Sequence, residues 1–164
     1  MTKLRDSLKA DYFSVLDGVS YFHDSDEQTE LVRLLCKNII NAILDVKSPE
    51  KLLSINIYRM SKFAKSDNEN DIKLATYFLS LPPVDIIEWV YEANDIFSDA
   101  GKYDSEVLEL ESNYITHAIN TQEYTNPFNG ELITRKQFED MINVVFRVSN
   151  EFIVKYHKVR GQFQ

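Results

Sequence analysis

The chain has 164 residues, of which 44% are hydrophobic and 12% aromatic, which is enough to fill a core and excludes a disordered chain. Four Gly and four Pro are few for a turn-rich β architecture, and the lone Cys36 excludes an internal disulfide. Charges interrupt the N-terminal stretch, which excludes a signal peptide or a membrane span there. We therefore expect one α-helical domain over residues 1–164, in the cytoplasm and without membrane contact.

The net charge of −8 is concentrated in one part of the chain. Residues 66–125 hold thirteen Asp and Glu against two Lys and Arg, whereas the segments before and after them are slightly positive. An asymmetry of this kind bears on the choice of partner rather than on the fold. The acidic middle segment, residues 66–125, is therefore either a docking surface or a means of keeping the protein soluble.

Apolar residues recur at intervals of three and four over the first half of the chain, which is typical of amphipathic helices. Together with capping residues, this pattern predicts helices over residues 2–17, 26–46, 48–65 and 67–81. The two prolines at 82 and 83 are expected to end the fourth helix and to start the next one.

The acidic middle segment is predicted to contain two further helices, over residues 83–101 and 105–119. The loop that follows carries two turn signals, Asn126-Pro127 and Asn129-Gly130. Short extended runs around Tyr124 and Leu132 could pair across this turn as a minimal β-hairpin within residues 122–133. The loop is either a recognition element or a turn that directs the last helix.

The last helix is predicted over residues 134–160, with a capping box formed by Thr134 and Gln137. Its apolar residues recur every seven positions at Phe138, Val145, Phe152 and Val159. The segment INVVFRV is β-prone, but the unbroken periodicity favours a helix. This long helix is expected to be the core of the fold, or in part the interface of a homodimer.

These elements predict an all-α fold, a single-domain bundle of about six to seven helices with a long C-terminal core helix. No motif indicates chemistry: G-x-S-x-G, G-x-x-x-x-G-K-[ST] and G-x-G-x-x-G are all missing from the sequence. We expect no catalytic residues, no cofactor and no metal site, so an enzyme is the less favoured class.

One enzymatic alternative comes from two groups of carboxylates. Asp26, Glu27 and Glu30 begin one predicted helix, and Glu92 and Asp95 lie on another. This arrangement resembles the E-E-x-x-E and E-x-x-D motifs of the MazG-like all-α nucleoside triphosphate pyrophosphatases, although Asp26 stands in place of the first Glu. The resemblance implies Mg²⁺-dependent hydrolysis of a nucleotide.

The strongest functional signal is a stripe of acids with no Lys or Arg between them. At 100° per residue, those on the predicted helix 83–101 fall within about 80° of one another. The helix after it extends the stripe, whose members are Asp85, Glu88, Glu92, Asp95, Asp99, Glu106 and Glu109. Like charges spaced by four residues oppose helix formation, so a stripe that does not help folding indicates another use.

The resulting hypothesis is a small acidic protein-binding protein, an inhibitor or regulator that docks its carboxylates on a basic partner protein. A nucleic-acid-binding protein is one such partner, whereas direct binding of nucleic acid is disfavoured because phosphates would be repelled. The alternatives are the Mg²⁺-dependent hydrolase and a structural or assembly subunit with no activity of its own.

Overall fold

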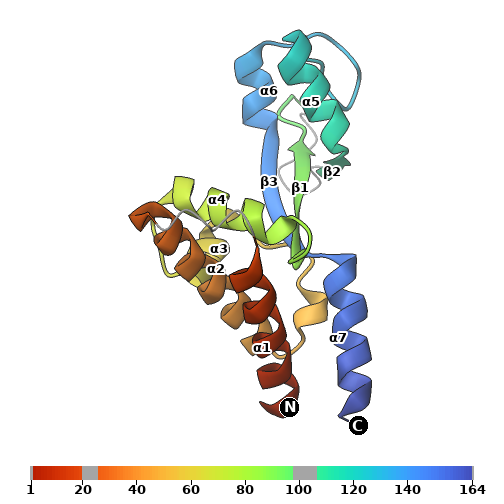
Figure 1. Cartoon of the computed structure of the whole chain (residues 1–164). Helices are drawn as coiled ribbons and strands as arrows, with labels where there is room; N and C mark the ends of the chain where they lie inside the picture. Colours follow the sequence, from red (N-terminus) through yellow and green to blue (C-terminus); the bar gives the residue numbers. More distant parts are fainter. Residues whose placement is uncertain (1, 20–25, 98–106, 164) are drawn as a thin grey trace. The chain divides into compact units, whose positions relative to one another are not determined.

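The computed structural model describes residues 2–19, 26–97 and 107–163, and it shows a mixed α/β protein (Figure 1). Helices predominate, but three strands form an antiparallel sheet in the order β2-β1-β3. The prediction of an all-α bundle is therefore wrong. The chain divides into two compact units: unit 1 comprises residues 1–89 and 146–164, and unit 2 comprises residues 90–145.

Unit 1 is mainly helical, and several of its helices begin at a residue whose side chain accepts a backbone N–H. Asp26 accepts from Thr29, and Asn68 accepts from Asp71, as N-cap residues do. The elements of unit 1 are α1 (Thr2–Gly18), α2 (Glu27–Asp45), the 3-10 helix η2 (Pro49–Lys51), α3 (Ile57–Ala64), α4 (Glu69–Ser80) and α7 (Asn150–Gln162), with the beginning of β1 and the end of β3.

The core of unit 1 lies among these helices and the strand ends. Its largest fully buried side chains are Leu8, Leu16, Ile39, Ile40, Ile43, Leu44, Ile55, Met60, Ile72, Leu79, Phe146 and Phe152. The predicted helices 2–17, 26–46 and 67–81 are confirmed, because each buries its apolar face in this core. Cys36 is also fully buried, as an apolar position on α2 would suggest.

Unit 2 packs two helices on one face of its part of the sheet. Its elements are β1 (Ile87–Asn94, from residue 90), β2 (Val107–Leu110), α5 (Ser112–Thr121), α6 (Arg135–Met141) and β3 (Ile142–Val148, to residue 145). Ile115 and Ala118 of α5 and Phe138 of α6 form the buried centre. Tyr91 of β1 and Leu110 of β2 pack against it, so their face of the sheet is the one that the helices cover.

The register of β1 and β2 places residues of the same kind opposite each other. Tyr91 lies opposite Leu110, and Glu92 lies opposite Glu109. Successive side chains of a strand point to opposite faces. Since Tyr91 and Leu110 face α5 and α6, Glu92 and Glu109 point to the other face of the sheet.

The predicted acidic helix 83–101 is not a helix in its described part, residues 83–97. A turn with a cis Pro82-Pro83 bond and a left-handed Asp85 (φ 43°) follows α4, and β1 begins at Ile87. Ile87, Val90 and Ala93 are buried although they lie on both faces of the strand. This spacing of three imitates the period of a helix, which explains why the sequence pattern was misleading.

The predicted C-terminal helix 134–160 is broken into three elements, α6, β3 and α7. The segment INVVFRV forms β3, because its backbone finds partners elsewhere in the chain. In unit 1, Phe146 exchanges two backbone hydrogen bonds with Ile55, and Val148 N donates to Leu52 O. A homodimer through this region stays a prediction, and it would not use a continuous helical face.

The four remaining predictions of local structure had different outcomes. The predicted helix 48–65 consists of η2 and α3 with a link between them, and the predicted helix 105–119 consists of β2 and α5 where it is described. The capping box of Thr134 and Gln137 is confirmed. The minimal hairpin is also confirmed, as a single antiparallel bridge between Thr125 and Leu132.

Among the described residues, no helix is both long enough and apolar enough to cross a membrane.

Candidate acidic binding site

The five described carboxylates of the predicted stripe do not share a helix face, and they belong to different units of the chain. Asp85 and Glu88 belong to unit 1, whereas Glu92, Asp95 and Glu109 belong to unit 2. Asp99 and Glu106 lie outside the described residues. The candidate site therefore has to be rebuilt from the residues that the fold brings together.

Glu88 is neutralised within unit 1. Its carboxylate accepts a hydrogen bond from the guanidinium Nε of Arg147 on β3, and both side chains are about one-third exposed. The opposite charges of the two side chains offset each other, so the pair adds no net charge to the surface. Glu88 therefore forms an ion pair within the sheet, and its role in partner binding stays a prediction.

Asp85 lies in a hollow of unit 1 that contains charges of both signs. Asp11, Glu151, Lys155 and Lys158 line it together with Asp85. Burial raises the pKa of Asp85 above its usual range, and the negative charges of Glu151 and Glu88 add to this effect. The hollow is thus electrostatically mixed and does not extend an acidic surface.

Glu92 and Glu109 form the centre of the site that remains. They lie directly opposite one another in the β1–β2 ladder. Side chains in this relation have Cβ atoms about 4.5–5.5 Å apart, and like charges there oppose pairing of the strands. Asp95, just after β1, has a local role, because its carboxylate accepts from the backbone N–H of Phe97. The ladder therefore carries two acids close together on a face that the helices do not cover.

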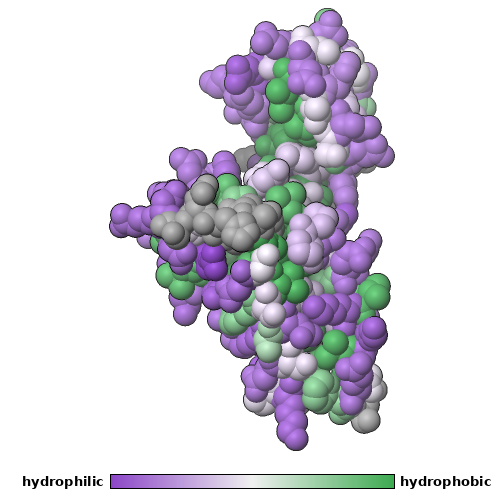
Figure 2. Space-filling model, viewed as in Figure 1, coloured by the Kyte–Doolittle hydropathy of each residue, from purple (hydrophilic) through white to green (hydrophobic). Residues whose placement is uncertain are grey.

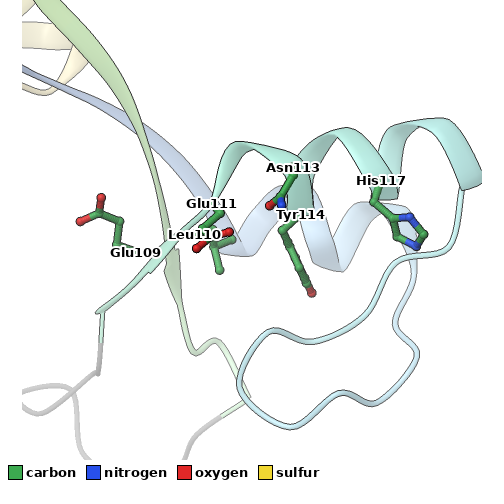
Figure 3. Close-up of a pocket in the computed structure, with 6 residues that line it drawn as sticks. All are labelled: Glu109, Leu110, Glu111, Asn113, Tyr114 and His117. Carbon is green, nitrogen blue, oxygen red and sulfur yellow. The ribbon is translucent and has the colours of Figure 1, made fainter.

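A hollow of about 610 Å³ adjoins the end of β2, where the chain enters α5 (Figure 3). Its walls are the side chains of Glu109, Leu110, Glu111, Asn113, Tyr114 and His117. Tyr114 is fixed in position, because its hydroxyl lies 2.8 Å from both the carbonyl and the Oγ1 of Thr125. Figure 3 shows Tyr114 and His117 projecting from α5, while Glu109 lies apart from them on β2. The hollow combines two carboxylates with apolar walls.

The sequence prediction missed Glu111, Tyr114 and His117. The signal that would have found the strand is the segment VLELE at residues 107–111, in which leucines alternate with glutamates. Alternation with a period of two is typical of a strand with one covered face. The helical interpretation of residues 105–119 concealed this pattern.

The two units differ in net charge. Unit 2 contains eleven Asp and Glu against three Lys and Arg, which gives −8, whereas unit 1 contains fifteen of each and is neutral. Unit 2 also exposes large apolar side chains over 36% of their surface or more, namely Ile96, Phe97, Val107, Leu108, Ile119 and Leu132. On the face shown in Figure 2, hydrophilic residues cover most of unit 2, with hydrophobic residues between them.

The carboxylates of the MazG-like resemblance lie on elements of different kinds, with Glu27 and Glu30 on α2 and Glu92 on β1. Glu92 lies on strand β1 and Asp95 in the turn after it, so the E-x-x-D pair is not helical. Within residues 2–19, 26–97 and 107–163, no group of three His, Cys, Asp or Glu side chains is placed to hold a metal ion. The resemblance to the MazG-like enzymes therefore lacks the second helical motif on which it depends.

Comparison of the chain with protein-family models, with curated proteins and with solved structures gives no significant match. The functional argument therefore depends on the charge and geometry of the described residues.

Proposed function

We propose that this protein is a binding protein, an inhibitor or regulator, whose unit 2 docks on the basic surface of a partner protein. The observation that carries this proposal is the division of charge: the whole net charge of −8 belongs to unit 2, and unit 1 is neutral. Acids that only kept the protein soluble would have no reason to gather in one unit. A concentrated negative field instead speeds association with a positive surface and selects it over other surfaces.

The surface chemistry of unit 2 supports the same conclusion. Protein interfaces combine apolar or aromatic groups with a polar rim. Exposed apolar residues such as Phe97, Val107 and Leu108 lie in the same unit as the acids Glu92 and Glu109. The apolar residues would supply most of the affinity, and the carboxylates would determine which partner is accepted.

The partner is expected to carry clustered Lys and Arg. A nucleic-acid-binding protein is a suitable candidate, because such a protein already presents positive charge to phosphates. Nucleic acid itself would be repelled by unit 2. A cytoplasmic location is part of the proposal, since a single cysteine is typical of a reducing compartment.

The test is a triple charge reversal in unit 2, with Glu92, Glu111 and Glu123 changed to Lys. The fold should persist, because Lys at position 92 would face Glu109 and replace a like-charged pair by an opposite-charged one. Wild-type protein should retain basic proteins from extracts of its source cells, and less of them as salt is added. The variant should lose these proteins.

The matched control makes the same change of charge in unit 1. Asp6, Glu27 and Asp67 are exposed there, and changing them to Lys leaves unit 2 unaltered. This control should retain the partners of the wild type. Equal retention by the unit 2 variant would refute the proposal and would favour a structural subunit whose acids only maintain solubility.

A further inference from the structure

The hollow that contains Asp85 belongs wholly to unit 1 and measures about 610 Å³. This volume falls within the range of roughly 300–1,000 Å³ that is usual for pockets that bind small ligands. Its charged side chains are those of Asp11, Asp85, Glu151, Lys155 and Lys158. Within the described part of the chain, none of these five forms an ion pair. Charges of both signs are therefore open to a ligand.

The charges of the hollow are separated along α7. Successive residues of a helix rise by about 1.5 Å, so Glu151 and Lys158 stand roughly 10 Å apart along the axis. Asp85 lies at the Glu151 end, because its carbonyl accepts from Ser149, the N-cap of α7. The two carboxylates repel each other, which helps to raise the pKa of Asp85. The hollow thus has an acidic end at the start of α7 and a basic end at Lys158.

A buried hydroxyl lies between these two ends. The ring of Tyr12 is 4.1 Å from the Nζ of Lys155, which is midway along α7 between the acidic and the basic end. Tyr12 is only 3% exposed and lines the hollow, yet its hydroxyl makes no hydrogen bond to any described residue. Burial raises the pKa of Tyr12, and the negative charges of Asp85 and Asp11 add to this effect, so the hydroxyl stays a donor. Because buried polar groups are normally hydrogen-bonded, this hydroxyl favours a ligand with an acceptor between its charged ends.

We propose that the hollow binds a short apolar peptide by its two free ends, with the ammonium group between Asp85 and Glu151 and the carboxylate at Lys158. An extended chain spans about 3.3–3.6 Å per residue, so three residues match the separation of roughly 10 Å. The hydroxyl of Tyr12 would donate to a carbonyl of the peptide backbone. This site lies in unit 1, so the inference goes beyond the docking function proposed for unit 2.

The walls of the hollow determine the kind of peptide. Besides the charged groups, they are formed by apolar side chains, namely Pro82, Pro83, Val84, Val154 and Val159. Such walls suit small apolar side chains between the two charged ends. A simple anion would meet three carboxylates, and a simple cation would meet two lysines. A single free amino acid is too short to pair with both ends, whereas a tripeptide pairs with both.

The test uses the tripeptide Val-Ala-Val as the probe and isothermal titration calorimetry of the whole protein. N-acetylation removes the positive charge of the probe, and C-terminal amidation removes its negative charge. Each capped peptide should bind about tenfold more weakly than the free peptide or worse, because it loses a charge-assisted hydrogen bond. Free valine should also bind at least about tenfold more weakly.

Two variants assign the ends of the peptide. Lys158→Gln should weaken binding of Val-Ala-Val by several-fold and should abolish its preference over the amidated form, as expected for groups that interact directly. Glu151→Gln should reduce the preference over the N-acetylated form. The matched controls are Lys47→Gln and Glu27→Gln, at exposed positions of unit 1 outside the hollow, and the second of these is also in the first turn of a helix. Both controls should keep all affinities within about twofold of the wild type.

Several results would overturn this inference. They are an absence of binding by Val-Ala-Val, an affinity that capping of either end leaves unchanged, and full wild-type preferences in Lys158→Gln or Glu151→Gln. Equal affinity for free valine would exclude a ligand of three residues. None of these results bears on unit 2, whose proposed function fails only if the triple reversal there retains the partners of the wild type.

Discussion

Changing Ser149 to Ala should destabilise unit 1 by more than a typical surface substitution, because its side chain bonds two backbone groups. Ser149 is only 3% exposed and is the N-cap of α7. Its Oγ accepts from Phe152 N at 3.0 Å and donates to the carbonyl of Asp85 at 2.5 Å. The hydroxyl of Ser149 thus caps helix α7 and also holds the strained turn before β1 in place.

The expected cost has two parts. Loss of an N-cap residue costs about 1 kcal/mol, and leaving a part-buried carbonyl without its donor costs about 1–3 kcal/mol. Together these losses should lower the free energy of unfolding by about 2–4 kcal/mol. For a chain of this size, the midpoint of thermal unfolding should fall by roughly 5–15 °C.

Urea and thermal unfolding followed by circular dichroism would measure this loss. Ser149→Thr keeps the hydroxyl and should recover most of the stability, which would assign the effect to the two hydrogen bonds. Ser54→Ala, at an exposed serine of the same unit, is the control and should be nearly neutral. A cost within about 0.5 kcal/mol of the control for Ser149→Ala would refute this account of the turn.

Phe152→Ala should lower the free energy of unfolding by about 3–5 kcal/mol, because Phe152 is fully buried. Val154→Ala on the same helix, at a side chain 66% exposed, should lower it by less than about 0.5 kcal/mol. Equal losses of stability in urea unfolding would contradict the assigned packing. Burial raises the pKa of Cys36 to about 12, so its labelling by a thiol reagent at pH 8 should be about a thousandfold slower in the folded protein than in denaturant. Comparable rates would show an accessible thiol. Because the pKa of Asp85 is raised in the folded state, its charged form opposes folding, and lowering the pH through that pKa should stabilise the protein. Asp85→Asn should therefore be more stable than wild type at pH 7 and should lack this gain on acidification; an unchanged pH profile of unfolding would disprove the linkage.

The sequence by itself determined the elements whose hydrogen bonds are local. The helices α1, α2 and α4 follow from apolar periodicity, and the cap at Asn68 and the capping box of Thr134 follow from residues three positions apart. The concentration of charge is also visible without a structure, and the tertiary structure added the boundary that makes one unit neutral and the other acidic.

Only the tertiary structure decided residues 87–94 and 142–148. Both segments combine β-prone residues with apolar spacings of three and four, so local propensity did not resolve helix from strand. A helix makes its hydrogen bonds within one segment, but a strand depends on partners far along the chain. Leu52 and Ile55 supply such partners to β3, and β2 supplies them to β1. Because that pairing is non-local, the position of Glu92 opposite Glu109, and with it the candidate site, could not be derived from residue spacing.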